Sequence, residues 1–134
     1  MKCNYTALCS FELSKKLRDA GFPQQPIHDW YGPEGALMPF LPEDEFLNAP
    51  NFAQVFDWLM EKGIPELNVT FMPALFEDDE ETYGFTMTAK IPNKNGNGYY
   101  YRPFSSPYNV RYPAWPEAAT AAIEKALIIL EERK

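Results

Sequence analysis

The chain has few of the residues that most often carry catalysis or bind metals. Histidine occurs once, as His28, and cysteine occurs twice, as Cys3 and Cys9, among 134 residues. One imidazole and two thiols six positions apart do not supply the four ligands of a known zinc spacing. Neither cysteine lies in a recognised nucleophile motif, and two cysteines do not make a disulfide framework. We therefore expect no metal site, no cofactor and no catalytic centre, and we expect the cysteines to be unbridged.

Positive charge is also scarce. Twelve Lys and Arg stand against nineteen Asp and Glu, which gives a net charge of −7 and a pI near 4.7. General nucleic-acid binders and binders of anionic membranes need an excess of cations, so this balance disfavours both functions. The phosphate-binding glycine loop is missing as well, because "NKNGNG" lacks the Lys-Ser/Thr pair and the helix that follow such loops.

Long apolar runs are absent. No apolar stretch reaches the roughly 18 residues needed to span a bilayer. The opening "MKCNYTALCSFELSKK" has no apolar core and no small-residue cleavage site, so the sequence predicts no signal peptide. These absences indicate a cytoplasmic protein, and the length of 134 residues indicates a single domain over residues 1–134.

Apolar side chains at helical spacing predict a first helix in "TALCSFELSKKLRDAGFP". Thr6 or Ser10 is a suitable N-cap. Gly21 fits the position after the last turn, where a left-handed backbone is favoured, and Phe22 can then contact Leu17. The face predicted to be buried consists of Cys9, Leu13, Leu17 and Ala20.

Two further helices are predicted from the residues at their ends. In "NFAQVFDWLMEKGIP", Asn51 and Gln54 have the spacing of a capping box, and Gly63 follows the last turn. The alanine-rich segment "WPEAATAAIEKALIILEERK" begins with Pro116, which suits the first turn of a helix. Its small side chains allow this helix to approach closely whatever it covers.

Between the second and third helices the sequence pattern changes to a period of two, which predicts strands. The segment "TYGFTMTAKI" alternates apolar and polar residues, while "ELNVTFM" before it and "GYYYRPF" after it are the expected antiparallel neighbours. The segment from Ile27 to Phe40 fits a small hairpin around "GPEG", and "PEDEF" fits a single helical turn. The sequence therefore predicts an α+β fold: a helix-β-β-β-helix core in which helices pack on one face of a three-stranded antiparallel meander. The early hairpin is a candidate extension of that meander.

The segment "NGNGYYYRPFSSPYNVRYPAW" contains seven aromatic side chains, which suit either a stacking surface or a packed strand and loop. Strand alternation places Tyr99 and Tyr101 on one face and Tyr100 on the other, and we expect one of these sets to pack beneath the helices. We expect Trp115 to anchor the start of the last helix. If the segment binds a partner, the candidate residues are Tyr100, Tyr101, Arg102, Tyr108 and Arg111.

Two resemblances bear on function. From Asn51 to Lys134, the predicted order of elements resembles that of the double-stranded-RNA-binding domain. That family carries lysines at the start of its last helix, where this chain has "WPEAATAA". The motifs "FELSKKLRDAGFPQQ", "NAPNFAQVFDWLMEKGI" and "WPEAATAAIEKALIIL" resemble a family of small uncharacterised proteins from prophages and mobile elements of gut anaerobes. This second resemblance implies a phage-related setting and no particular site.

Four hypotheses follow. We favour a non-enzymatic accessory protein that binds another protein, acts away from membranes, and is a monomer or a homodimer. The second hypothesis is a nucleic-acid binder that uses the Tyr99–Tyr101 strand with nearby arginines. The third is an acidic mimic of nucleic acid that uses "EDDEE", residues 77–81. The fourth is an enzyme built on His28 and one cysteine.

Overall fold

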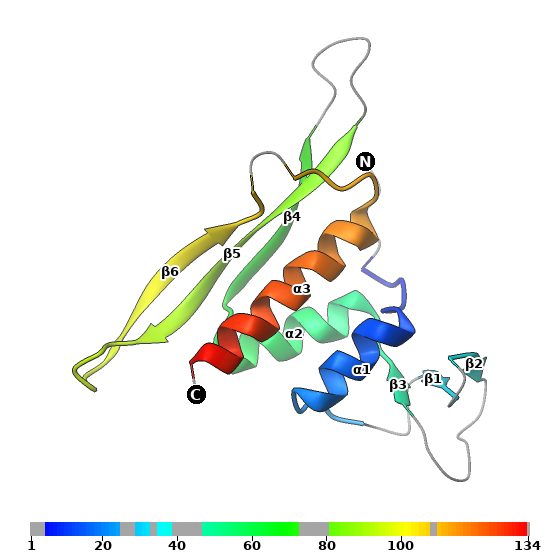
Figure 1. The fold of residues 1–134 in the computed structure, drawn as a ribbon, viewed down its shortest axis with the longest axis horizontal. Coiled ribbons are helices and arrows are strands. Elements are labelled where there is room, and N and C mark those ends of the chain that lie inside the picture. The colour runs from blue at the N-terminus through cyan, green and yellow to red at the C-terminus, as the bar shows by residue number, and fades with distance from the viewer. Residues whose placement is uncertain are drawn as a thin grey trace. The chain divides into compact units, whose positions relative to one another are not determined.

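The computed structural model describes residues 5–24, 29–32, 35–38, 47–72, 81–107 and 110–133 (Figure 1). They form two compact units, Tyr5–Val55 and the part from Phe56 onward, and the boundary falls within helix α2, Phe52–Lys62. Helices and antiparallel sheets occur together, so the predicted α+β class is confirmed. None of the helices among the described residues combines the length and apolar character that a membrane span requires.

The first unit contains helix α1, Phe11–Asp19, with the ends predicted from the sequence. The backbone N–H of Leu13 donates to the Ser10 hydroxyl at 3.1 Å, so Ser10 is the N-cap. After the helix, Gly21 has a φ of 99°, and the N–H of Phe22 donates to the carbonyl of Leu17 at 2.9 Å. The predicted face is buried at its first three residues, but Ala20, the C-cap, is exposed.

The early hairpin exists and belongs to a small sheet of its own. Strands β1 (Asp29–Tyr31), β2 (Leu37–Met38) and β3 (Leu47–Ala49) pair antiparallel in the order β2-β1-β3. The hairpin therefore pairs with β3 and does not extend the meander. Strand β3 was not predicted from the sequence, because three residues are too few to show a period. The "PEDEF" segment, residues 42–46, lies outside the described residues.

Helix α2 is bounded by two local hydrogen-bond motifs. At its start, the N–H of Asn51 donates to the Gln54 side chain and the N–H of Gln54 donates to the Asn51 side chain, both at 2.9 Å. At its end, Gly63 has a φ of 112°, and the N–H of Ile64 donates to the carbonyl of Leu59 at 2.9 Å. Both predicted ends are confirmed. Trp58, which the helical pattern places toward the edge of the apolar stripe, is buried.

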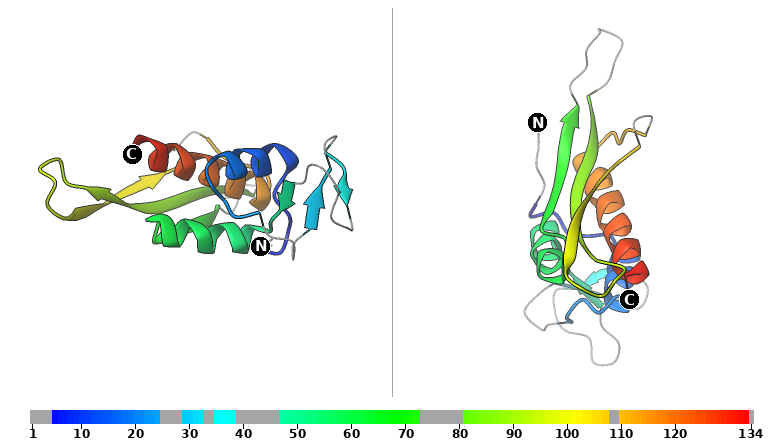
Figure 2. Two further views of the ribbon diagram at one scale, coloured as in Figure 1. Left: turned by 90° about the horizontal axis from the view of Figure 1, so that it is seen from below. Right: turned by 90° about the vertical axis from the view of Figure 1, so that its left-hand side faces the viewer.

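The second unit is built on the predicted meander of β4 (Glu66–Met72), β5 (Thr82–Pro92) and β6 (Tyr99–Ser105), in the order β4-β5-β6. Helix α3, Trp115–Glu132, contacts β4 and β5 and covers one face, which we call the inner face (Figures 1 and 2). Small residues on α3 are completely buried and allow close packing. The buried side chains of β5 on this face are Tyr83, Phe85, Met87 and Ala89.

Arg133 joins three elements at the C-terminal end of α3. Its Nη1 donates to the carbonyl of Lys90 in β5 and its Nη2 donates to the carbonyl of Lys62 in α2, both at 2.7 Å. The Lys62 carbonyl belongs to the last turn of α2, where carbonyls lack helical partners. The hydrogen bond to Lys90 thus joins the C-terminal end of α3 to β5. Residues 91–100, the hairpin tip, project beyond the end of α3 (Figures 1 and 2).

Candidate functional site

The three consecutive tyrosines of β6 are all exposed. Their relative exposures are 59% for Tyr99, 45% for Tyr100 and 62% for Tyr101. The prediction that one set packs beneath the helices is therefore wrong. The reason is the length of α3, which ends beside Lys90 and leaves the hairpin tip without a covering helix. Exposed aromatic side chains of this size on adjacent positions are typical of binding surfaces.

The tyrosines alternate between the two faces of the sheet, as strand geometry predicts. Tyr100 pairs with Ile91 and Tyr101 with Lys90 across the β5–β6 ladder. Because Met87 and Ala89 face α3, the register places Tyr100 and Arg102 on the inner face and Tyr99 and Tyr101 on the outer face. The candidate residues therefore lie on both faces of one strand.

Cations accompany the aromatic rings on both faces. On the outer face, Nζ of Lys90 lies 4.4 Å from the ring centre of Tyr99. On the inner face, the guanidinium of Arg102 lies 4.8 Å from the ring centre of Phe104. Nζ of Lys125, from α3, lies 5.5 Å from the same ring. Neither lysine was predicted from the sequence. The strand register could have indicated Lys90, whereas only the tertiary structure brings Lys125 to the ring of Phe104.

The remaining two candidate residues are Tyr108 and Arg111. Tyr108 lies outside the described residues. Arg111 is exposed beside Tyr112, which forms an isolated bridge with Tyr83 through N–H···O bonds of 2.8 and 2.9 Å. Tyr83 and Lys90 are separated by about 23 Å along β5, given the rise of a β-strand. Trp115 is buried at the start of α3, which confirms its predicted anchoring role.

Among the described residues, no strand pairs with the outer edge of β6, which is the last strand in the order β4-β5-β6. At the two ends of the ladder, Asn93 N–H donates to the carbonyl of Gly98 at 3.0 Å and Ser106 N–H donates to the carbonyl of Phe85 at 2.9 Å. Backbone hydrogen bonding alternates along an antiparallel strand. The backbone N–H and C=O groups of even-numbered residues of β6 therefore bond to β5, and those of odd-numbered residues point away from β5 in the plane of the sheet, which we call outward. Pro103 is at an outward position and costs the sheet no hydrogen bond.

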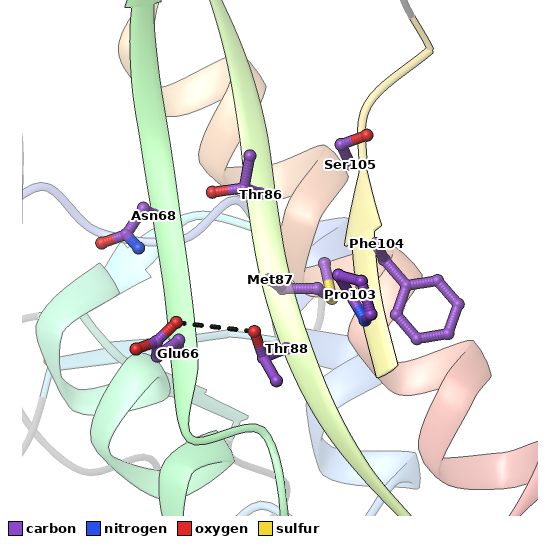
Figure 3. A pocket seen from close by; sticks show the side chains of 8 residues that line it. All are labelled: Glu66, Asn68, Thr86, Met87, Thr88, Pro103, Phe104 and Ser105. Carbon is purple, nitrogen blue, oxygen red and sulfur yellow. Dashed lines mark hydrogen bonds between the residues drawn. The ribbon is translucent and has the colours of Figure 1, made fainter. Parts of the chain in front are cut away.

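The outer face of the sheet also carries a shallow pocket of about 350 Å³, lined by both polar and apolar residues (Figure 3). Side chains from all three strands line it, among them Glu66, Asn68, Thr86, Thr88 and Ser105. The hydroxyl of Thr88 donates to Oε2 of Glu66 at 3.5 Å, a long and weak contact. Among the described residues, no group of three or more His, Cys, Asp or Glu is placed to hold a metal ion. The pocket offers hydrogen-bonding groups to a polar ligand or to side chains of a partner.

No family model, curated protein or solved structure matches this chain.

The features behind two other hypotheses fall largely outside the described residues. His28 and Cys3 lie outside the described residues. Of the "EDDEE" run, only Glu81 is described, and its side chain is exposed. Cys9 is a free, buried thiol, and burial raises its pKa to about 12. A thiol with such a pKa stays protonated at neutral pH, which is the unreactive form.

Proposed function

We propose that this chain is a non-enzymatic accessory protein of a phage or mobile element that acts in the cytoplasm by binding another protein through β6. The observation that carries the proposal is the exposure of Tyr99, Tyr100 and Tyr101 on a strand whose outer edge is left unpaired by the described part of the chain. The unpaired N–H and C=O groups of an edge strand can pair with a strand of another chain. Tyr and Arg are also enriched among the residues that dominate binding energy at protein interfaces.

The phage or mobile-element setting is supported by the resemblance of the motifs in α1, α2 and α3 to those of prophage proteins. These motifs are caps, turn glycines and buried faces, so they support a shared fold more directly than a shared partner. The non-enzymatic part of the proposal is supported by the unreactive state of Cys9.

Single-stranded nucleic acid is the second candidate partner, because Tyr99, Tyr101 and Lys90 lie together on the outer face. Stacking platforms usually present several rings on one face with cations following the strand. Here the outer face carries two of the three rings, while Tyr100 and Arg102 lie on the inner face. A protein partner that reaches both faces of the edge strand uses all of these groups.

A photo-crosslinking amino acid at position 101 tests the proposal in the native host. We expect Tyr101→p-benzoylphenylalanine to trap a protein on illumination. The matched control is the same substitution at Ile128, which is 52% exposed on α3 of the same unit. We expect no adduct there.

Three results would contradict the proposal. An adduct at position 101 that nuclease removes would assign the surface to nucleic acid. Equal adducts at positions 101 and 128 would show nonspecific collisions. No adduct at position 101 would show that β6 is not the binding surface.

A further inference from the structure

Charge is distributed unevenly along the chain, and the β5–β6 hairpin has only one sign. Residues 82–112, which we call the carboxylate-free segment, contain Lys90, Lys94, Arg102 and Arg111 and no Asp or Glu. The rest of the chain has eight Lys and Arg against nineteen Asp and Glu. The protein is acidic as a whole but has a basic hairpin. Negative charge on a partner would therefore steer the partner toward this hairpin.

Among the described residues, the cations of this segment have no carboxylate as a counter-charge. Within the part of the chain that the structure describes, none of the four forms an ion pair with a carboxylate. Lys90 and Arg102 lie instead over aromatic rings on opposite faces of the hairpin. An acidic partner would therefore gain new charge pairs without breaking existing ones.

We infer that the partner of β6 is an extended, acidic protein segment that joins the sheet as a fourth strand beside Tyr99–Ser105. This inference rests on the proposed function and specifies its partner. The outward N–H groups of Tyr99 and Tyr101 donate to the added strand, and the outward carbonyls accept from it. Carboxylates on its two faces lie near Arg102 on the inner side and near the Lys90–Tyr99 pair on the outer side.

A second copy of this chain fits the edge less well. Pairing two β6 edges brings two carboxylate-free segments together, with four cations from each. Pro103 also lacks the outward N–H that a self-paired ladder uses twice, once in each copy. Cations and proline on an edge strand are devices that prevent such self-pairing. The same cations attract an acidic strand.

Nuclear magnetic resonance titration with a designed peptide tests this inference. The probe is a capped peptide of alternating Thr and Glu, added up to millimolar concentration, and its controls are the Thr-Lys peptide and oligo-dT. We expect the acidic peptide to slow hydrogen exchange at the Tyr99 and Tyr101 amides. The Tyr100 amide, which bonds to β5, should change little. Binding by the Thr-Lys peptide, or by oligo-dT alone, would overturn the inference.

Substitutions at position 101 separate backbone pairing from contact through the ring. Tyr101→Pro removes the ring and the outward N–H, as at Pro103, whereas Tyr101→Ala removes only the ring. We expect Tyr101→Pro to bind the acidic peptide roughly tenfold more weakly than Tyr101→Ala does. Equal loss in both variants would mean that the ring alone binds. If Tyr101→Pro fails to fold, Arg102→Glu replaces it, and unchanged peptide binding by this variant would contradict the inference.

The outcomes distinguish this inference from the proposed function. If the acidic peptide does not bind while the crosslinker at position 101 still traps a protein, the partner is not an acidic strand and the proposed function stands. If both experiments fail, β6 is not the binding surface.

Discussion

Cys9 shows how one buried side chain loses its usual chemistry. Its side chain has no solvent exposure, and burial raises the pKa of the thiol from 9.0 to about 12. Its carbonyl accepts a 2.6 Å hydrogen bond from the hydroxyl of Tyr31, which fixes the backbone at this position. The folded chain therefore holds the thiol proton in a pH range where the unfolded chain releases it.

This proton makes stability depend on pH. Above pH 9 the unfolded chain binds fewer protons at Cys9 than the folded chain does, so rising pH favours unfolding up to about pH 12. We expect Cys9 to lower the free energy of unfolding by at most about 1.4 kcal/mol per pH unit in this range. Urea unfolding of the protein and of Cys9→Ala between pH 8 and pH 10.5 measures it. The same decline in both proteins would rule out a contribution from Cys9.

At the scale of elements, the end of α2 depends on both a local turn and a distant side chain. Gly21 and Gly63 follow the last turns of α1 and α2, and both have positive φ. A Cβ on Gly21 would meet no atom within 4 Å, whereas a Cβ on Gly63 would collide with the guanidinium of Arg133. Only Gly63 therefore has two independent reasons to be glycine.

The two glycines form a matched pair for mutation. Gly21→Ala should cost about 1–2 kcal/mol of stability from backbone strain alone. Gly63→Ala should cost at least about 1 kcal/mol more, because displacing the guanidinium removes its hydrogen bonds to Lys62 and Lys90. Denaturant unfolding measures both values. In an Arg133→Ala background the extra cost at Gly63 should disappear, and its persistence would refute this explanation.

At the scale of the whole molecule, the two compact units share one helix. The boundary between Val55 and Phe56 lies within α2, which is continuous from Phe52 to Lys62. Unfolding either unit would remove packing from one part of this helix. Short isolated helices are marginal in water, so the helix couples the units, and we expect them to unfold together as a single domain.

The three tryptophans report on this coupling. Trp30 lies in the first unit, Trp58 and Trp115 lie in the second, and all three are buried. With 5-fluorotryptophan incorporated, the three fluorine resonances should change from folded to unfolded positions at the same urea concentration. A resonance of Trp30 that changes at a lower concentration than the other two would show that the units unfold separately.

The helices and the meander strands of this protein follow from local sequence, because the interactions that define them join residues close in the chain. The capping box joins Asn51 and Gln54, three positions apart, and the turns at Gly21 and Gly63 are closed by hydrogen bonds between residues five positions apart. The alternation in β5 needs no information from elsewhere. These features therefore predicted the α+β class, the three helices and the meander.

The binding surface was decided by contacts between distant residues. Whether Tyr99–Tyr101 are covered depends on where α3 ends relative to β5, which the bond from Arg133 to Lys90, 43 positions apart, establishes. Two other contacts also join residues far apart in sequence: Lys125 lies over the ring of Phe104, and β1 pairs with β3. Periodicity shows which residues of a strand share a face, but coverage of that face depends on the length and position of another element.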